Sequence, residues 1–127
     1  MNDFDSTTAQ RDPLVDWHGT LLRAGGDIEF IKELVPVFME QEAEIVDALC
    51  AAVAAKDSSA VQQAAHTLKG AIANFSEGPA WQRASGLEKT GYAGQWNEAE
   101  QELEKLQSEL KLLNAALRDF ERGIVQK

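Results

Sequence analysis

One histidine stands in a short run of residues whose types and spacing suggest chemistry. The run reads Ala65-His66-Thr67-Leu68-Lys69-Gly70. It lies in a segment whose apolar residues recur at steps of three and four, which is typical of an amphipathic helix. A helix advances about 100° per residue, so His66 points roughly 140° away from the middle of the apolar face. We therefore expect the imidazole to face solvent.

A solvent-facing imidazole can act as a nucleophile. Imidazole side chains have an ordinary pKa of about 6.5, so the unprotonated form prevails at neutral pH. Such a ring can attack phosphorus in line and hold the group as a phosphoramidate, with positioning and electrostatics supplying most of the catalysis. Lys69 follows His66 by three residues, one helical turn away, where its charge can offset the phosphoryl oxygens. The pattern therefore predicts that His66 is a phosphoryl acceptor and that Lys69 is its electrostatic helper.

The other residues on this face are small or carry amides. Gly70 is unfavourable inside a helix, by about 1 kcal/mol relative to alanine. Together with Ala73, it leaves bare helix surface beside the imidazole, which a bulky partner could approach closely. Gln62 or Gln63 could donate to phosphoryl oxygens or orient the ring. The predicted partner-contact positions are Gly70, Ala73 and Ser59.

The segment with the histidine is one of five predicted helices. Glycine, proline and aspartate separate five runs of apolar residues at helical spacing, and no run has the period of a strand. Pro36 should kink the second helix or split off its first turns. The sequence predicts an all-α fold, an antiparallel four-helix bundle with a short additional N-terminal helix. The expected helices run from the cap at Asp12-Pro13 to Gly25-Gly26, from Ile28 to Ala55, from the cap at Asp57 to Phe75, from Pro79 to Gly91, and from Trp96 to Ile124.

Length and charge narrow the class of protein further. The 127 residues predict a flexible tail at 1–11 and a single helical domain at 12–127. The net charge of −9 disfavours binding to nucleic acid and to anionic membranes. There is no apolar run long enough to cross a bilayer and no secretory signal pattern. The only cysteine, Cys50, is at helical spacing from apolar neighbours, so we expect it to be a small core residue. We expect a cytoplasmic monomer.

The run around His66 resembles the histidine-containing phosphotransfer (HPt) domains of phosphorelays. That family has a signature of the form A-H-x-L-K-G with a downstream L-E, matched here by Leu87-Glu88. The likeness extends over about residues 14–120; the further matching positions are Leu21, Gly25-Gly26-Asp27, Phe38, Ala73-Asn74-Phe75 and Ala84. The chain differs from the family pattern at Ala71 and Ser76-Glu77.

The resemblance implies a function in two-component signalling. His66 would accept a phosphoryl group from the aspartate of one receiver domain and pass it to another, with Lys69 as helper and Gly70 as the clearance position. The implied partners are response-regulator receiver domains and a hybrid histidine kinase. No cofactor is implied for this chain, because the Mg²⁺ would belong to the receivers.

Two alternatives to a phosphocarrier stay open. A non-catalytic helical adapter could bind receivers or other signalling partners without accepting phosphate, although the presence of both His66 and Lys69 argues against it. A coiled-coil oligomer could form on the last helix, although Leu112 and Ala116 widen its apolar face and favour a bundle. The sequence has no glycine-rich nucleotide loop, so we expect no kinase activity of its own.

Overall fold

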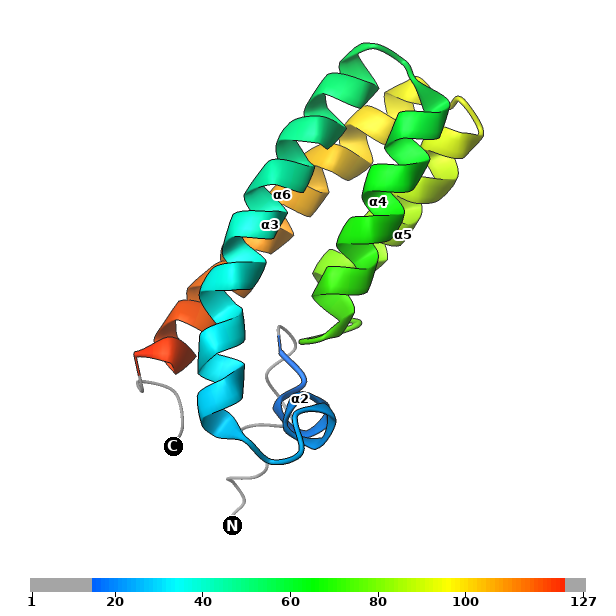
Figure 1. The fold of residues 1–127 in the computed structure, drawn as a ribbon. Coiled ribbons are helices and arrows are strands. Elements are labelled where there is room, and N and C mark those ends of the chain that lie inside the picture. Colours follow the sequence, from blue (N-terminus) through cyan, green and yellow to red (C-terminus); the bar gives the residue numbers. More distant parts are fainter. Residues whose placement is uncertain (1–14, 123–127) are drawn as a thin grey trace.

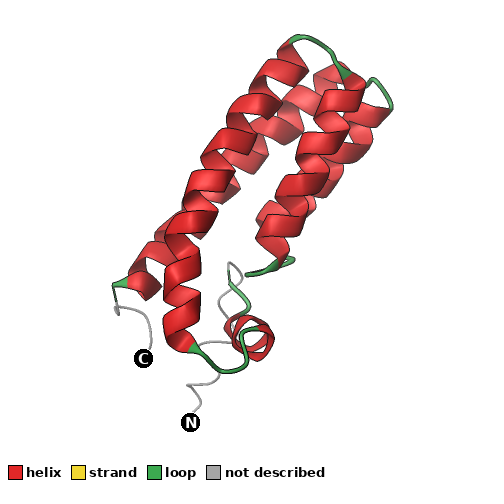
Figure 2. Ribbon diagram, viewed as in Figure 1, coloured by secondary structure: helices red, strands yellow, loops and turns green. Residues whose placement is uncertain are grey.

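The computed structural model describes residues 15–122, and every regular element within that range is a helix (Figure 1; Figure 2). The predicted all-α class is confirmed. The helices are α2 (Trp17–Arg23), α3 (Ile28–Ala54), α4 (Ser58–Ala73), α5 (Pro79–Tyr92) and α6 (Trp96–Glu121). The tail predicted at 1–11 and the predicted helix end at Ile124 lie outside the described residues, so the single domain at 12–127 stays a prediction.

The four long helices pack around one shared core. Helices α3 and α5 each contact both α4 and α6, and short connections at 55–57, 74–78 and 93–95 join consecutive helices (Figure 1). Leucine, isoleucine, valine and alanine side chains from all four helices fill the interior, together with Phe38 and Phe75, whose rings meet edge to face at 5.3 Å. None of the described helices is long and apolar enough to span a membrane.

The first described helix begins later than the sequence predicts. Asp12 and Pro13 lie outside the described residues, but Trp17 is the first helical residue of α2 and Asp16 is its N-cap. The Asp16 carboxylate accepts a hydrogen bond from the backbone N–H of Gly19 at 3.0 Å. This satisfies an amide of the first turn, the role that the sequence analysis gave to Asp12. The predicted end of the helix at Gly25-Gly26 is correct, and both glycines have positive φ values.

Helix α2 closes the C-terminal end of α4. The hydroxyl of Thr20 donates to the carbonyl oxygen of Asn74 at 3.0 Å, and the guanidinium of Arg23 donates to the same oxygen at 2.9 Å. The backbone N–H of Asp16 donates to the carbonyl oxygen of Phe75 at 2.7 Å. These bonds satisfy carbonyl groups that the end of a helix leaves without partners.

Pro36 does not split α3, which was one of the two outcomes expected for it. The helix continues from Ile28 to Ala54 with the proline inside. Val35 and Phe38 beside Pro36 are buried, whereas Pro36 itself is exposed. The missing N–H therefore lies on the solvent side, and burial of the neighbouring apolar residues offsets its loss.

Two other packing expectations need adjustment. Leu112 is exposed and Ala116 is half-buried, so only Ala116 widens the buried face of α6 as predicted. Cys50 is half-buried rather than fully within the core, and its sulfur lies 3.8 Å from the side-chain amide of Gln107. Ala116 and Cys50 therefore lie at the margin of the core.

Helices α4 and α5 approach each other closely at Gly91, which gives a test of the packing. A Cβ atom added there would collide with the Val61 side chain, whereas one added at Gly70 would meet nothing within 4 Å. We predict that Gly91→Ala lowers the free energy of unfolding by about 1–3 kcal/mol. Gly70→Ala should raise it by up to about 1 kcal/mol through helix propensity. Urea unfolding of both variants measures this, and equal effects would contradict the packing.

Candidate functional site

Helix α4 presents His66 to solvent, as the periodicity predicts. The helix is capped by Asp57, whose carboxylate accepts from the N–H of Ala60 at 3.1 Å. Its buried residues fix the rotation of the helix; they are Val61, Ala65, Leu68 and Ile72. The side chain of His66 is 72% exposed. Gly70, one turn further on, leaves open space beside the ring.

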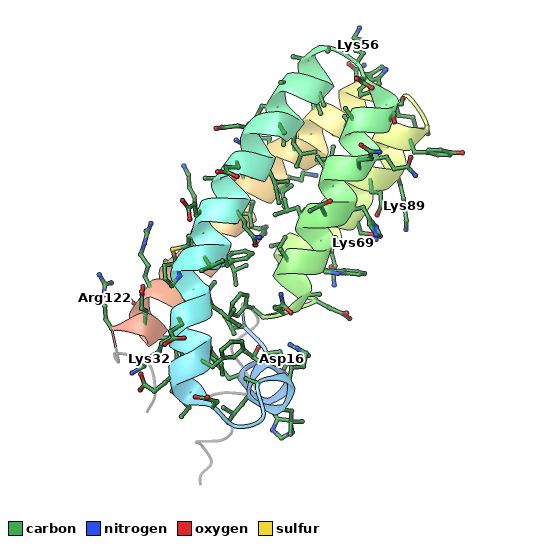
Figure 3. All side chains as sticks on the ribbon, viewed as in Figure 1. Asp16, Lys32, Lys56, Lys69, Lys89 and Arg122 are labelled. Carbon is green, nitrogen blue, oxygen red and sulfur yellow. The ribbon has the colours of Figure 1, made fainter. Side chains whose placement is uncertain are left out.

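Glu88 of α5 joins His66 to Lys69. One carboxylate oxygen of Glu88, Oε2, lies 3.2 Å from Nδ1 of His66, and the other, Oε1, accepts from Nζ of Lys69 at 2.6 Å. Lys69 projects on the side of α4 where α5 lies (Figure 3). The side chains of Glu88 and Lys69 are only 19% and 21% exposed. The site is therefore a partly buried ion pair with an exposed imidazole attached.

The protonation of Glu88 determines which nitrogen of the ring is free. Burial raises the pKa of Glu88, but the hydrogen bonds and positive charges of Lys69 and His66 outweigh burial and bring the pKa below its ordinary value of 4.5. The group is thus a carboxylate at neutral pH and can only accept hydrogen bonds. Nδ1 of His66 must then be the donor, so the neutral ring has its lone pair on Nε2.

Trp81 is the second contact of Lys69 from α5. The ammonium lies 5.4 Å from the centre of the Trp81 ring, within the range of a cation–π interaction. The helical spacing of Trp81 favours a core position over a binding role; in the structure the ring is half-buried and packs against the core, and it also lies near the Lys69 ammonium. Trp81 and Glu88 are seven residues apart on α5, a spacing that places both on one face of the helix.

The remaining predicted residues lie on α4 without contacting the ring. Gln62 is half-buried and Gln63 is exposed, and within the described part of the chain neither side chain forms a hydrogen bond with His66. Orientation of the ring comes from Glu88, a residue the sequence analysis quoted only as part of a motif. Ser59 is exposed and Ala73 is half-buried. Contacts of these four residues with a phosphoryl group or a partner stay predictions.

Comparison with protein families identifies the chain. The sequence model of the Hpt domain family matches residues 33–120, which is more than half of the chain. The protein therefore belongs to the Hpt domain family. The match covers most of α3, all of α4 and α5 with the site, and nearly all of α6. Hpt domains transfer phosphoryl groups on histidine in phosphorelays, where they interact with receiver domains and kinases. No curated protein and no solved structure matches the chain.

The pKa of Glu88 predicts how stability depends on pH. A carboxylate whose pKa is lowered by folding stabilises the folded state above its unfolded pKa, and this contribution disappears as the pH falls through the folded pKa. At pH 7 we predict that wild type exceeds Glu88→Gln in unfolding free energy by about 1 kcal/mol. Well below pH 4.5 the two should converge.

Urea unfolding at both pH values, with Glu104→Gln as the control for an exposed glutamate in the interior of a helix, measures the effect. A difference between wild type and Glu88→Gln that persists undiminished in acid would show that Glu88 acts by packing and not by charge.

Proposed function

We propose that the protein is a phosphorelay intermediate in which Nε2 of His66 accepts a phosphoryl group from a receiver aspartate and passes it to another receiver. The observation that carries this proposal is the exposed ring whose Nδ1 is held by an ionised Glu88. A fixed Nδ1–H leaves the Nε2 lone pair free for attack, on a ring whose side chain is mostly exposed. Membership of the Hpt domain family supports the same reaction.

The transfer proposed here requires no proton movement on the ring. The lone pair of Nε2 attacks phosphorus while the bond from phosphorus to the aspartate oxygen breaks and the aspartate leaves as a carboxylate. The ring then carries a positive charge with hydrogen still on Nδ1, and the carboxylate of Glu88 stabilises it. In the second transfer an aspartate oxygen of the next receiver attacks phosphorus, the P–N bond breaks, and its electrons return to Nε2.

Electrostatic support comes from both proteins. Lys69 would offset the charge of the phosphoryl oxygens, and Gln62 or Gln63 could donate hydrogen bonds to them. Gly70, with Ser59 and Ala73, would form the surface on which the receiver docks. The Mg²⁺ would be held by the receiver, and this chain would act as a phosphocarrier without kinase activity of its own.

We further propose a helix arrangement, an oligomeric state, a location and partners for the protein. The four long helices would form an antiparallel bundle, acting as a monomer in the cytoplasm with receiver domains and a hybrid kinase as partners. The second candidate, a non-catalytic adapter, is less well supported. An adapter requires neither an exposed imidazole nor a lysine held beside it, and both are present.

Phosphotransfer from a panel of receiver domains tests the carrier role. A receiver loaded with labelled phosphate should transfer it to wild type and to His18→Gln, but transfer to His66→Gln should fall at least about 100-fold. The product should be acid-labile, as phosphoramidates are. Transfer to His66→Gln at the wild-type rate, or to neither protein across the panel, would refute the carrier role.

The open surface at Gly70 predicts an effect of side-chain size on docking. Gly70→Leu should remain folded, because nothing lies within 4 Å of the position, yet the added side chain would separate the two proteins. We expect transfer to slow by about tenfold or more, with Gly70→Ala intermediate. Ala115→Leu, on an exposed position of α6, is the control. If Gly70→Leu transfers as fast as this control, the receiver does not dock over Gly70.

A further inference from the structure

The side chain of Lys69 is held on two sides. Surface lysines ordinarily sample many rotamers, and confining one carries an entropic cost. Here Nζ lies 2.6 Å from Glu88 Oε1 and 5.4 Å from the centre of the Trp81 ring, and the side chain is only 21% exposed. Both contacting residues, Trp81 and Glu88, belong to α5, and Lys69 itself follows His66 by one turn of α4. Lys69 is thus confined beside the place where a phosphoryl group would arrive.

The two contacts restrict the Lys69 ammonium group in different ways. An ammonium has three N–H donors, and Glu88 Oε1 occupies one of them. The Trp81 ring attracts the charge through its face and does not require one particular N–H direction. If an incoming phosphoryl group competes with Glu88 for Lys69, the ring can still hold the ammonium close to His66. Glu88 cannot do this alone, because its carboxylate is also engaged with Nδ1.

Trp81 is placed rigidly enough for this purpose. It lies in the first turn of α5, which begins at Pro79, and the ring packs against the core on one side. Helix α5 also contributes Glu88 from the same face, so one helix sets both contacts of Lys69. An aromatic ring fixed in this way acts as a platform over which the ammonium can move by small distances.

We propose that Trp81 is a positioning residue that keeps the Lys69 ammonium beside His66 during phosphoryl transfer. The proposal rests on the proposed function, because it concerns the same site. Trp81 acts only through Lys69, so its effect should depend on the presence of the lysine. The strength of the effect should follow the attraction of the ring for a cation, which is greatest for tryptophan and smaller for phenylalanine.

The experiment measures the single-turnover rate of transfer from a phosphorylated receiver. Trp81→Phe and Trp81→Leu are each made in wild type and in Lys69→Met, with Trp96→Leu as a control at another half-buried tryptophan. Trp81→Leu should slow transfer by about fivefold, and Trp81→Phe by less. In the Lys69→Met background, neither change should slow transfer further. Trp96→Leu should transfer at the wild-type rate.

Two results would overturn the proposal. The first is transfer to Trp81→Leu at the wild-type rate. The second is an equal slowing of transfer by Trp81→Leu with and without Lys69, as general damage to the fold would produce. Should Trp81→Leu fail to fold, Trp81→Phe in both backgrounds gives the same comparison. Absence of transfer to the wild-type protein itself would instead refute the proposed function, so the two failures are distinguishable.

Discussion

The carboxylate of Glu88, shared between His66 and Lys69, is the contact on which the site depends. One oxygen faces Nδ1 of the ring and the other accepts from Nζ of the lysine, so a single group orients both. Lys69 in turn helps to keep Glu88 ionised, which is the condition for its role as acceptor from the ring. Without this link, an imidazole that is 72% exposed would be free to turn and to exchange its hydrogen between the two nitrogens.

The shared carboxylate requires a fixed spacing between α4 and α5. Hydrogen bonds tolerate only a few tenths of an ångström, so the register of the two helices must be set elsewhere. Gly91 packs directly against Val61 at one end of the pair, and α2 bonds to the last carbonyl groups of α4 at the other. The core therefore does more than stabilise the fold, because it places Glu88 within reach of two residues on another helix.

Local signals in the sequence predicted α4 and the exposure of its histidine. Asp57 caps the helix as expected, and the apolar spacing alone sets the direction of His66. Contacts between helices could not be predicted in this way, because they depend on the rotation of α5 relative to α4. The spacing of Trp81 and Glu88 shows that they share a face, but not that this face meets Lys69. For the same reason, the sequence suggested Gln62 or Gln63 as the group that orients the ring, whereas the structure places Glu88 beside Nδ1.

The start of α2 shows a different limit. Asp12-Pro13 has the composition of a helix start, yet Asp16 caps α2, because the helix forms where Thr20 and Arg23 can bond to the end of α4. Tertiary contacts thus help to set where α2 begins, and local composition alone did not point to Asp16. The net charge of −9 would repel an incoming phosphoryl group, which is itself an anion. Screening in salt confines repulsion from distant charges to about 10 Å, so the charges beside His66, those of Lys69 and Glu88, matter most.

The most direct test of the account is to determine which nitrogen is phosphorylated. Protein labelled with ¹⁵N, phosphorylated by a loaded receiver domain, would be examined by NMR for coupling between phosphorus and the ring nitrogens of His66. A single phosphorus signal coupled to Nε2, with hydrogen on Nδ1, is the predicted result. Coupling to Nδ1, or a phosphorus signal from any other residue, would contradict the assignment of Glu88 as the group that directs the chemistry.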